Sequence, residues 1–443
     1  MKFRLFHTIA CLGSLAALCL HSSQVEAIFA SVKSTGMAAT SISYPLDSLA
    51  GAYNPAGEAY VGDRVDVEAG WVHDWGHARV FNNAAPNPNP PPANLPPDNP
   101  ITNGTFQGMR TKDAYPVGFG INKTWCLCQD WEVATSFIAY NRNFQKTTYN
   151  QFLPLFGTSH AGLEYLNQTV SPIIALKWCD SQTIGISANY QIERIKVNGL
   201  ENFDVAPTAQ RPVGTVAPGH VTNRGYDWST GWGFTVGYLG RFFCDQLAVG
   251  VTYQPKTSMS RLTKYKGFLA QRGKLDIPRK IGAGISYRVL PCVVVAFDVE
   301  HIQWSKIPAL HNPILPSGAI FPNLLGAHNG PGFGFKDQWY YRVGAEWTIT
   351  EEFVARIGFR HANTPIKRSQ TAVNVLTLDT VEDFITVGGT WNINPCNELS
   401  FVYAYGFEKV VKGKNSNPII FGGGETNIKE QKYALGVAWG WKF

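Results

Sequence analysis

The sequence has few charged residues and, beyond its N-terminus, no long hydrophobic stretch. Asp, Glu, Lys and Arg make up 16% of its 443 residues, against about 25% in typical globular proteins. Past the N-terminal segment, no apolar run approaches the roughly 20 residues that a membrane-spanning helix needs. The net charge of +6 is spread along the chain without a polybasic block, so nucleic-acid binding has no specific support. These absences argue against a helical membrane protein and against a nucleic-acid-binding protein.

Motifs that mark common enzymes and metal sites are missing as well. The chain contains no H-E-x-x-H, G-x-S-x-G or C-x-x-C pattern, which are signatures of zinc, serine and thiol chemistry. The glycine-containing stretch 231–237, GWGFTVG, is not followed by an expected helix, so it does not resemble a phosphate-binding loop. We expect no enzymatic activity, no cofactor and no bound metal.

Alternation of apolar with small or polar residues is the strongest positive signal. Successive side chains of a β-strand point to opposite faces, so a period of two indicates strands. Segment 433–443 carries a bulky residue at every odd position and Ala, Gly or Lys between them. Its bulky face includes Trp439 and Trp441, which are typical of the aromatic girdle where a membrane meets water. We therefore expect this face to contact lipid.

About fourteen such segments can be placed along the chain, with short turns and long polar loops alternating between them. An even number of strands of about ten residues, connected in this rhythm, is typical of a bacterial outer-membrane barrel. The barrel must close, because an open sheet edge in hydrocarbon leaves backbone groups unpaired. A large soluble β-sandwich explains the alternation but not the rhythm of the connections. The expected fold is an all-β transmembrane antiparallel β-barrel with strands near 63–75, 114–126, 131–141, 168–178, 182–194, 229–242, 246–256, 279–289, 293–304, 339–349, 353–362, 381–393, 397–409 and 430–443.

The first 62 residues do not follow this rhythm. Residues 1–27 have a basic start, an apolar stretch and a small-residue cleavage site, as a secretory signal peptide does. A barrel of fourteen strands encloses a lumen too wide for its own side chains to fill. We expect residues 28–62 to form a hatch in that lumen and residues 63–443 to form the barrel; a disordered periplasmic leader is the alternative. The hatch is rich in Ala, Ser and Gly and has a turn signal at Asn54, Pro55, Ala56 and Gly57.

Several motifs resemble one family of proteins. The small residues at 34–37 and the NPAG turn look like its hatch, and further matches follow in order: GWGFTVGY (231–238), IPRKIGAG (277–284), QWS (303–305), FKDQWYYRVGAEW (335–347) and NTP (363–365). Together they resemble the FadL/TodX family of outer-membrane transporters of hydrophobic molecules. The resemblance implies a monomeric fourteen-stranded barrel with a lumenal hatch. It also implies passive uptake of long-chain fatty acids or other apolar molecules, which leave sideways into the membrane.

This resemblance places the chain in the outer membrane of a Gram-negative bacterium as a multi-pass barrel. Lipid, lipopolysaccharide and a long-chain fatty acid or other hydrophobic ligand are then its expected partners. The terminal Phe443 resembles the signature that the barrel-assembly machinery reads. A general porin for small solutes and a structural or adhesive envelope protein remain the alternative functions.

Two departures from the family concern the loops and the exit route. The first long loop contains PNPNPPPANLPPDNP, which indicates a polyproline-like surface excursion without a known transport role. The family's sideways exit depends on an inward kink in the third strand, but 131–141 contains neither Gly nor Pro. Pro172 in the fourth strand removes a ladder donor, so we expect either a weakened seam or a tolerated bulge there.

The long loops supply candidate ligand-binding residues. The second long loop and the fifth carry many apolar side chains, and the fourth is basic. Apolar loops beside a cationic loop would suit an amphipathic acid, because the tail is removed from water while the carboxylate meets charge. Packing of loop against loop over the barrel mouth is the alternative. The candidates in the second loop are Phe152, Leu155 and Phe156.

An arginine cluster on the inner wall is the other candidate ligand site. The turn at 350–352 predicts pairing of Ile349 with Phe353, which places Glu346 opposite Arg356 and Arg342 opposite Arg360. The two opposed arginines would repel each other without an anion between them. A hatch carboxylate, Asp47 or Glu58, and a fatty-acid headgroup held by one guanidinium are the two alternatives.

The cysteines that remain after removal of the signal peptide fall at or beside the short turns, and none lies in a long loop. Short turns of an outer-membrane barrel are periplasmic, so we expect all of these thiols in that oxidising compartment. Small apolar filling at strand ends is the alternative reading. Bridges within the chain and disulfide links to periplasmic proteins both remain open for Cys126, Cys128, Cys179, Cys244, Cys292 and Cys396.

Overall fold

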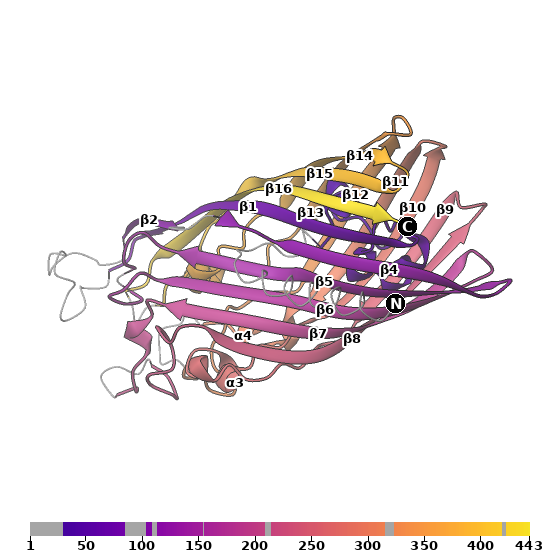
Figure 1. Ribbon diagram of the computed structural model, residues 1–443. Coiled ribbons are helices and arrows are strands. Elements are labelled where there is room, and N and C mark those ends of the chain that lie inside the picture. The colour runs from indigo at the N-terminus through magenta and orange to yellow at the C-terminus, as the bar shows by residue number, and fades with distance from the viewer. Residues whose placement is uncertain are drawn as a thin grey trace, which may run out of the picture.

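The computed structural model describes residues 30–84, 103–108, 113–153, 155–208, 214–314, 323–418 and 422–443. The expected signal peptide and the proline-rich part of the first loop lie outside these ranges. The described strands form one closed antiparallel barrel (Figure 1). Its fourteen wall strands are β1 (Arg64–Phe81), β4 (Val117–Cys128), β5 (Trp131–Thr148), β6 (Gly162–Trp178), β7 (Gln182–Asn198), β8 (Asp227–Phe242), β9 (Leu247–Gln254), β10 (Arg279–Leu290), β11 (Val293–Gln303), β12 (Gln338–Thr348), β13 (Phe353–Ala362), β14 (Asp383–Asn394), β15 (Asn397–Val411) and β16 (Glu425–Lys442).

The barrel closes through its first and last wall strands, as predicted. β1 pairs with β16 along their whole length, from Arg64 opposite Lys442 to Phe81 opposite Glu425. Two short strands, β2 (Gly104–Gly108) and β3 (Asp113–Ala114), pair with β1 beyond the end of β4 and so continue the position of β4 in the wall. The strand positions predicted from alternation are confirmed, and several strands extend further toward the long loops than the alternation indicated.

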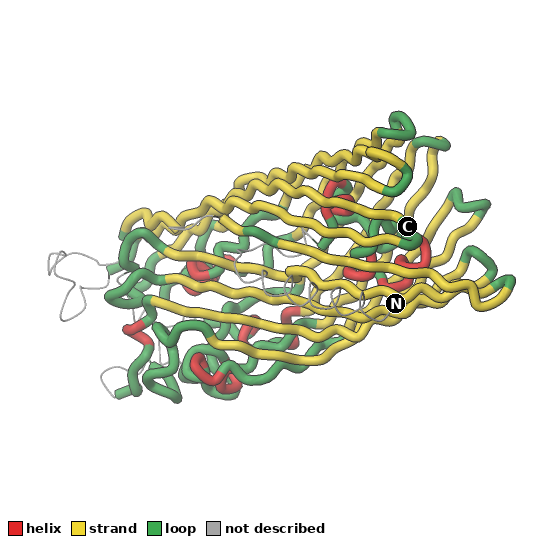
Figure 2. The backbone as a smooth tube through the Cα atoms, viewed as in Figure 1, coloured by secondary structure: helices red, strands yellow, loops and turns green. Residues whose placement is uncertain are grey.

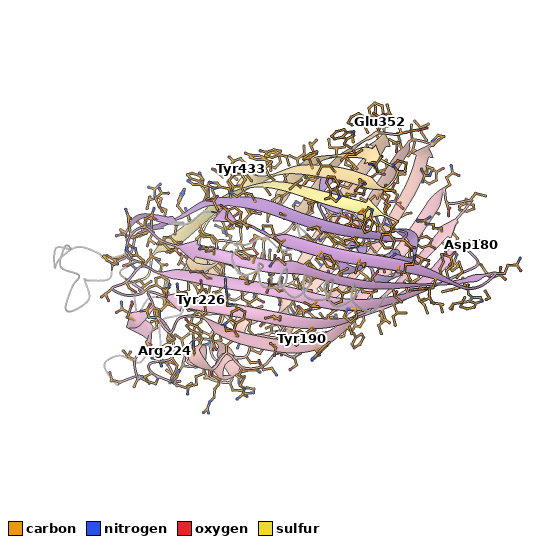
Figure 3. The ribbon with its side chains drawn as sticks, in the orientation of Figure 1. Asp180, Tyr190, Arg224, Tyr226, Glu352 and Tyr433 are labelled. Carbon is orange, nitrogen blue, oxygen red and sulfur yellow. The ribbon has the colours of Figure 1, made fainter. Side chains whose placement is uncertain are left out.

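The wall is inverted relative to a soluble protein, with its bulky apolar residues outside. On β16, Leu435, Trp439 and Trp441 are 47%, 46% and 49% exposed, whereas Ala434 and Ala438 on the opposite face are buried. Figure 3 shows Tyr433 of the same strand projecting outward from the wall. Such an outward apolar band with aromatic residues is what a barrel presents to lipid, and the assignment of this face to lipid follows.

Short turns and long connections lie at opposite ends of the barrel (Figure 2). Asp180 and Glu352, both in short turns, lie at the same end in Figure 3, and Arg224 and Tyr226 lie at the other. None of the described helices is long and apolar enough to cross a membrane. The helices of the long connections are η3 (Glu201–Phe203), η4 (Thr263–Tyr265), α3 (Ala270–Gly273), η5 (Trp304–Lys306), α4 (Pro308–His311), η6 (Arg368–Gln370) and η7 (Val373–Leu376).

Residues 30–62, called the N-terminal segment below, lie inside the barrel. Helix α2 (Val32–Gly36) contacts β13 to β16, and η2 (Pro55–Tyr60) contacts β5 to β8 on the facing wall, with η1 (Ala50–Ala52) beside η2. Ser31 caps α2 by accepting from the backbone of Ser34, and Asn54 caps η2 by accepting from Ala56. The segment is therefore a compact folded unit that spans the lumen between two walls.

Glycines on the inner wall make room for this segment. An added Cβ would lie 2.6 Å from the Met37 side chain at Gly344 and 2.4 Å from the Ala38 nitrogen at Gly358. These two glycines are opposed on β12 and β13. Such a close approach of the segment to the wall needs glycine at both positions.

Candidate ligand-binding cavity

A cavity of about 980 Å³, part of it open to solvent, lies in the loop-side half of the lumen. Its walls come from the loop-side parts of β5, β6, β7 and β16 and from three of the long loops. The residues around it are Arg142, Asn143, Gln145, Leu163, Tyr165, Asn167, Ile195, Leu269, Leu275, Asp276, Ile277, Pro278, Trp304, Leu310, Phe333, Phe335, Thr377, Asp379 and Lys432.

One side of this cavity is apolar and rigidly packed. The aliphatic side chains Leu163, Ile195 and Leu275 are nearly fully buried and belong to the main apolar cluster of the loop-side half. The Trp304 and Phe335 rings meet edge to face with their centroids 6.0 Å apart, a favourable aromatic arrangement. Such a surface can remove a hydrocarbon chain from water at about 0.8 kcal/mol per buried methylene.

The charged part of the lining consists of two cations, Arg142 and Lys432, and two carboxylates, Asp276 and Asp379. Lys432 forms an ion pair with Glu430 of the same strand at 3.2 Å. Arg142 donates to the Gln254 side chain at 2.7 Å, and no carboxylate in the described ranges forms an ion pair with it. The cavity therefore combines an apolar wall with a guanidinium that lacks a carboxylate partner in the described part of the chain.

A β-bulge in β5 lets Asn143 face the cavity directly after Arg142. The β5–β6 register shifts between Asn141 and Asn143, which leaves Arg142 as the extra residue. Before the bulge, the even-numbered residues of β5 such as Tyr140 are buried; after it, Asn143 and Gln145 line the cavity. Bulges often re-aim side chains beside functional sites, and this one places two consecutive residues on the lumen side.

Within the described residues, the ladder between β4 and β5 ends beside this bulge. Strand β4 pairs with β5 only as far as Gly118 opposite Tyr140, where the Asn141 side chain accepts from the Val117 nitrogen at 2.9 Å. Beyond that point β5 pairs with β6, whereas the described parts of β2 and β3 pair with β1. The third wall strand, β5, is therefore irregular at its bulge. This irregularity was not predicted, because residues 131–141 contain neither Gly nor Pro.

Pro172 produces a second, smaller interruption, in the ladder between β6 and β7. The pairing runs to Val170 opposite Tyr190 and resumes at Ile173 opposite Ser187, so Ser171 and Pro172 stand outside it. The Ser171 hydroxyl still bonds the Asn189 side chain at 2.7 Å. The register is the same on both sides, so this is a missing donor and not a bulge.

The predicted residues of the second loop lie away from the large cavity. Leu155 and Phe156 line two adjacent clefts of about 300 and 390 Å³ near the barrel mouth. Phe152 is 42% exposed and stacks on His160 with the ring centroids 5.0 Å apart. In the fifth loop, Leu310 lines the large cavity, and the stretch 315–322 lies outside the described residues.

The predicted register of β12 and β13 is confirmed. Arg342 is opposite Arg360, and Glu346 is opposite Arg356, which it binds at 2.6 Å. Arg342 forms an ion pair with Glu300 of β11 at 3.1 Å, and Lys280 of β10 binds the same carboxylate at 3.1 Å. The anion beside Arg342 is thus a carboxylate of the barrel wall. It is neither a hatch carboxylate nor a fatty-acid headgroup, which were the two alternatives considered.

The hatch carboxylates have other partners, so their predicted place between the arginines is wrong. Asp47 accepts from the Ser31 hydroxyl at 2.6 Å, and Glu58 accepts from the Gly51 nitrogen at 2.6 Å and from Ser136 of β5 at 2.8 Å. Arg360 instead lines a small cavity together with Thr35, Ala38, Ala39, Phe384 and Thr386. Its guanidinium carbon lies 4.1 Å from the centre of the Phe384 ring.

Side chains of the wall hold the N-terminal segment at several points. Asp298 accepts from the backbone nitrogens of Ser41 and Ile42 at 2.8 and 2.9 Å. Asn54 donates to the Tyr238 carbonyl at 3.0 Å and to the Ile42 carbonyl at 2.8 Å. Near the short turns, Glu398 of β15 binds Lys33, Arg64 and Lys442. These contacts tie the segment to both sides of the wall.

Burial shifts the protonation of two groups in this segment. It raises the pKa of the Glu58 carboxyl to about 8 and lowers the pKa of the Lys33 ammonium to about 8. At neutral pH Glu58 is therefore largely protonated, and its hydrogen bonds to Gly51 and Ser136 only partly oppose the cost of burial. The NPAG turn of Asn54, Pro55, Ala56 and Gly57 lies close to this carboxyl in the same buried unit.

The cavity residues Arg142 and Lys432 were missed at the sequence level for different reasons. Lys432 lies at an even-numbered position of the strand expected at 430–443, and the even positions of that strand were expected to face the lumen. The alternation alone therefore indicates that Lys432 faces inward. Arg142 continues the even-numbered inward face of β5, but it lies one residue beyond the strand expected at 131–141. Trp304 lies in the QWS stretch that marked the family resemblance, although its contact with a cavity was not foreseen.

Comparison with known proteins gives a family and a fold. Residues 130–443 match the family model described as outer membrane protein transport protein (OMPP1/FadL/TodX). No curated protein sequence matches the chain significantly. A FadL homologue from Pseudomonas aeruginosa has a similar structure, with a TM-score of 0.67 and 14% identity over 96% of this chain and 99% of that one.

Two solved transporters share the same architecture. The toluene transporter TodX of P. putida has a TM-score of 0.62 and 12% identity, covering 93% of this chain and 97% of that one. The toluene transporter TbuX of Ralstonia pickettii has a TM-score of 0.57 and 15% identity, covering 93% and 97%. At these identities the similarity establishes the barrel fold, while the substrate depends on the cavity itself.

Proposed function

Because this chain belongs to the OMPP1/FadL/TodX family of outer-membrane transport proteins, we propose that it takes up hydrophobic and amphipathic molecules, and long-chain fatty acids in particular, by passive diffusion. The proposal places it in the outer membrane of a Gram-negative bacterium, with its long loops outside. The observation that carries the choice of substrate is a cavity that combines an apolar lining with Arg142, which has no ion pair with a carboxylate in the described residues.

A fatty acid matches both features of this cavity. Its hydrocarbon tail would lie against the wall formed by Leu163, Trp304 and Phe333, and its carboxylate would reach Arg142 or Lys432. A guanidinium can hold a carboxylate through two parallel hydrogen bonds. The Arg342–Arg360 cluster is a weaker candidate for the headgroup, because Glu300 already neutralises Arg342.

The route begins at the clefts lined by Leu155 and Phe156, which would collect the ligand at the barrel mouth. It continues into the cavity and leaves sideways beyond Tyr140, where no described strand pairs with β5 on the β4 side. The N-terminal segment acts as a hatch, because it contacts facing walls of the lumen below the cavity. Direct passage of water-soluble solutes into the periplasm is then blocked.

A neutral aromatic hydrocarbon is the second candidate substrate, since two structural relatives are described as toluene transporters. Such a ligand would contact the apolar lining, but Arg142 and Lys432 would add nothing to its binding affinity. A general porin is a third reading, but it requires an open aqueous lumen. The Arg142 guanidinium in the cavity, which forms no ion pair with a described carboxylate, favours the fatty acid over both.

Binding of matched ligands to the purified protein tests the proposal. We expect oleate to bind at least tenfold more tightly than methyl oleate, because the ester lacks the charge that Arg142 and Lys432 meet. Arg142→Gln and Lys432→Gln should each weaken oleate binding and leave methyl oleate unchanged. Arg224→Gln, at an exposed loop position, is the matched control. Equal binding of acid and ester to all variants would contradict the fatty-acid assignment and favour a neutral ligand.

A further inference from the structure

The described cysteines gather at one end of the barrel. They lie in or beside the turns that join β4 to β5, β6 to β7, β8 to β9, β10 to β11 and β14 to β15. Among the short turns that the structure describes at this end, only the one between β12 and β13 has no cysteine. The positions are Cys126, Cys128, Cys179, Cys244, Cys292 and Cys396, here called the thiol rim.

Packing does not explain the thiol rim. Five of its thiols are exposed, Cys292 is half-buried, and all are free. A small apolar filler would instead be buried, as free cysteine usually is. Filling of gaps at strand ends is therefore a wrong reading of these residues.

Backbone geometry does not explain them either. Cys179 and Cys244 have φ angles of 50° and 55°. In this left-handed region a residue with a Cβ atom destabilises the fold by about 1 kcal/mol relative to Gly, and Gly or Asn is preferred. Local structure thus favours other residues at both positions. The described residues also contain no group of three or more His, Cys, Asp and Glu that could hold a metal ion.

Bridges between neighbouring turns of the same barrel are geometrically unfavourable. Adjacent strands lie about 4.8 Å apart, so turns separated by two strands are roughly 10 Å apart. A disulfide needs Cα atoms within about 7 Å. The first two of these turns do touch, because the Cys179 nitrogen bonds the Asp130 carbonyl at 3.0 Å. Their thiols are nevertheless separated by β5: Cys128 and Trp178, the neighbour of Cys179, pair with opposite sides of Trp131, and Cys128 and Cys179 are both free. The partner of a rim thiol is therefore expected on another chain.

We propose that the thiol rim is a covalent docking surface for a disulfide-bearing periplasmic protein. The proposal rests on the outer-membrane orientation given above, in which short turns face the periplasm. A rim cysteine attacks one sulfur of the partner's disulfide as its thiolate, forming a new S–S bond between the chains. The partner's second sulfur leaves as a thiolate and takes up the proton that the rim thiol released, so no further oxidant is needed.

The position of the rim favours a periplasmic partner over a second copy of this chain. Two barrels in one membrane meet through their lipid-facing walls, whereas the tips of the turns extend from the end of the barrel, as the position of Asp180 beside Cys179 shows in Figure 3. Cysteines occur from the end of β4 to the start of β15, most of the way around the barrel. A partner that lies beneath the rim can therefore meet a thiol from almost any direction.

Non-reducing gel electrophoresis of the full chain from its native cells, lysed in N-ethylmaleimide, tests this proposal. We expect bands well above the mass of the chain that collapse on reduction and contain a second protein. Replacing all six cysteines by Ser should reduce these bands at least tenfold. Restoring Cys244 alone, which is exposed, should recover more of them than restoring Cys292 alone, which is half-buried.

Two controls separate this result from failures of folding and of transport. The six-serine variant should keep the heat-dependent gel mobility of a folded barrel and unchanged oleate binding. Arg224→Cys in that background, at the opposite end, should not restore the bands. Labelling of all six thiols by N-ethylmaleimide without prior reduction would overturn the proposal. A cross-linked band containing only this chain would replace the periplasmic partner by a second copy.

Discussion

Arg342 of β12 lies directly opposite Arg360 of β13, and both guanidinium groups are buried in the lumen. Two like charges in this position are tolerated because Glu300 of the next strand binds Arg342. The same carboxylate also binds Lys280. The cluster therefore belongs to an ion-pair network of the wall, which the register alone did not show.

Substitution Arg342→Gln should destabilise the barrel without affecting fatty-acid binding. Breaking a buried ion pair costs about 3–5 kcal/mol, and the loss should be near the lower end because Lys280 still neutralises Glu300. Thermal unfolding followed by gel mobility measures the change. Glu300→Gln combined with Arg342→Gln should recover part of it, whereas reduced oleate binding at unchanged stability would assign the arginine to the ligand site.

Removal of the N-terminal segment should open the pore. Deleting residues 28–60 removes α2, η1 and η2 from between the facing walls, and water then fills a lumen too wide for wall side chains to close. We expect single-channel conductance in planar bilayers to rise from near zero to that of a porin of comparable strand number. A shortened protein that conducts no better than the full chain would show that the segment is no plug.

Docking of the segment should weaken as pH rises, because of Glu58. Burial raises the pKa of this carboxyl to about 8, so the folded protein binds its proton more tightly than the unfolded chain does. Protonated Glu58 therefore contributes fully to the free energy of unfolding below about pH 4.5. This contribution is lost progressively as the pH rises to about 8. Glu58→Gln should abolish this dependence, as measured by protease cleavage of the segment from pH 5 to 9. A pH profile identical to that of the unaltered protein would rule out Glu58 as its source.

Pro172→Ala tests which interruption of the wall matters for transport. The alanine restores a backbone donor between β6 and β7, which should stabilise the barrel by about 1 kcal/mol. Oleate uptake by cells should be unchanged if the ligand leaves beside the β5 bulge. A clear fall in uptake with normal amounts of folded protein would move the exit to the β6–β7 ladder.

The wall of this protein was predictable because its chemistry repeats along the chain. Outward residues such as Leu435 and Trp439 alternate with small inward ones, and a short turn then fixes the register, as it does for Glu346 opposite Arg356. Alternation fails where the backbone departs from regularity. The bulge at Arg142 reverses which residues of β5 face inward, and no composition signal marks it.

The cavity was less predictable than the wall because it is formed by contacts between distant segments. Trp304, Phe333 and Leu163 come from separate parts of the chain and meet only after the loops fold inward. The loop residues Leu155 and Phe156 were recognised as apolar, but sequence could not tell a cleft at the mouth from the deeper cavity. The pairing of Arg342 with Glu300 was less predictable because β11 and β12 are joined by a long loop, so no short turn fixes their register.

The location of a bound brominated fatty acid in crystals of the protein tests the central claim most directly. We predict anomalous bromine density among Leu163, Trp304 and Phe333, with the carboxylate within hydrogen-bonding distance of Arg142 or Lys432. Density confined to the clefts at Leu155 and Phe156, or a carboxylate bound at Arg342 and Arg360, would contradict the account.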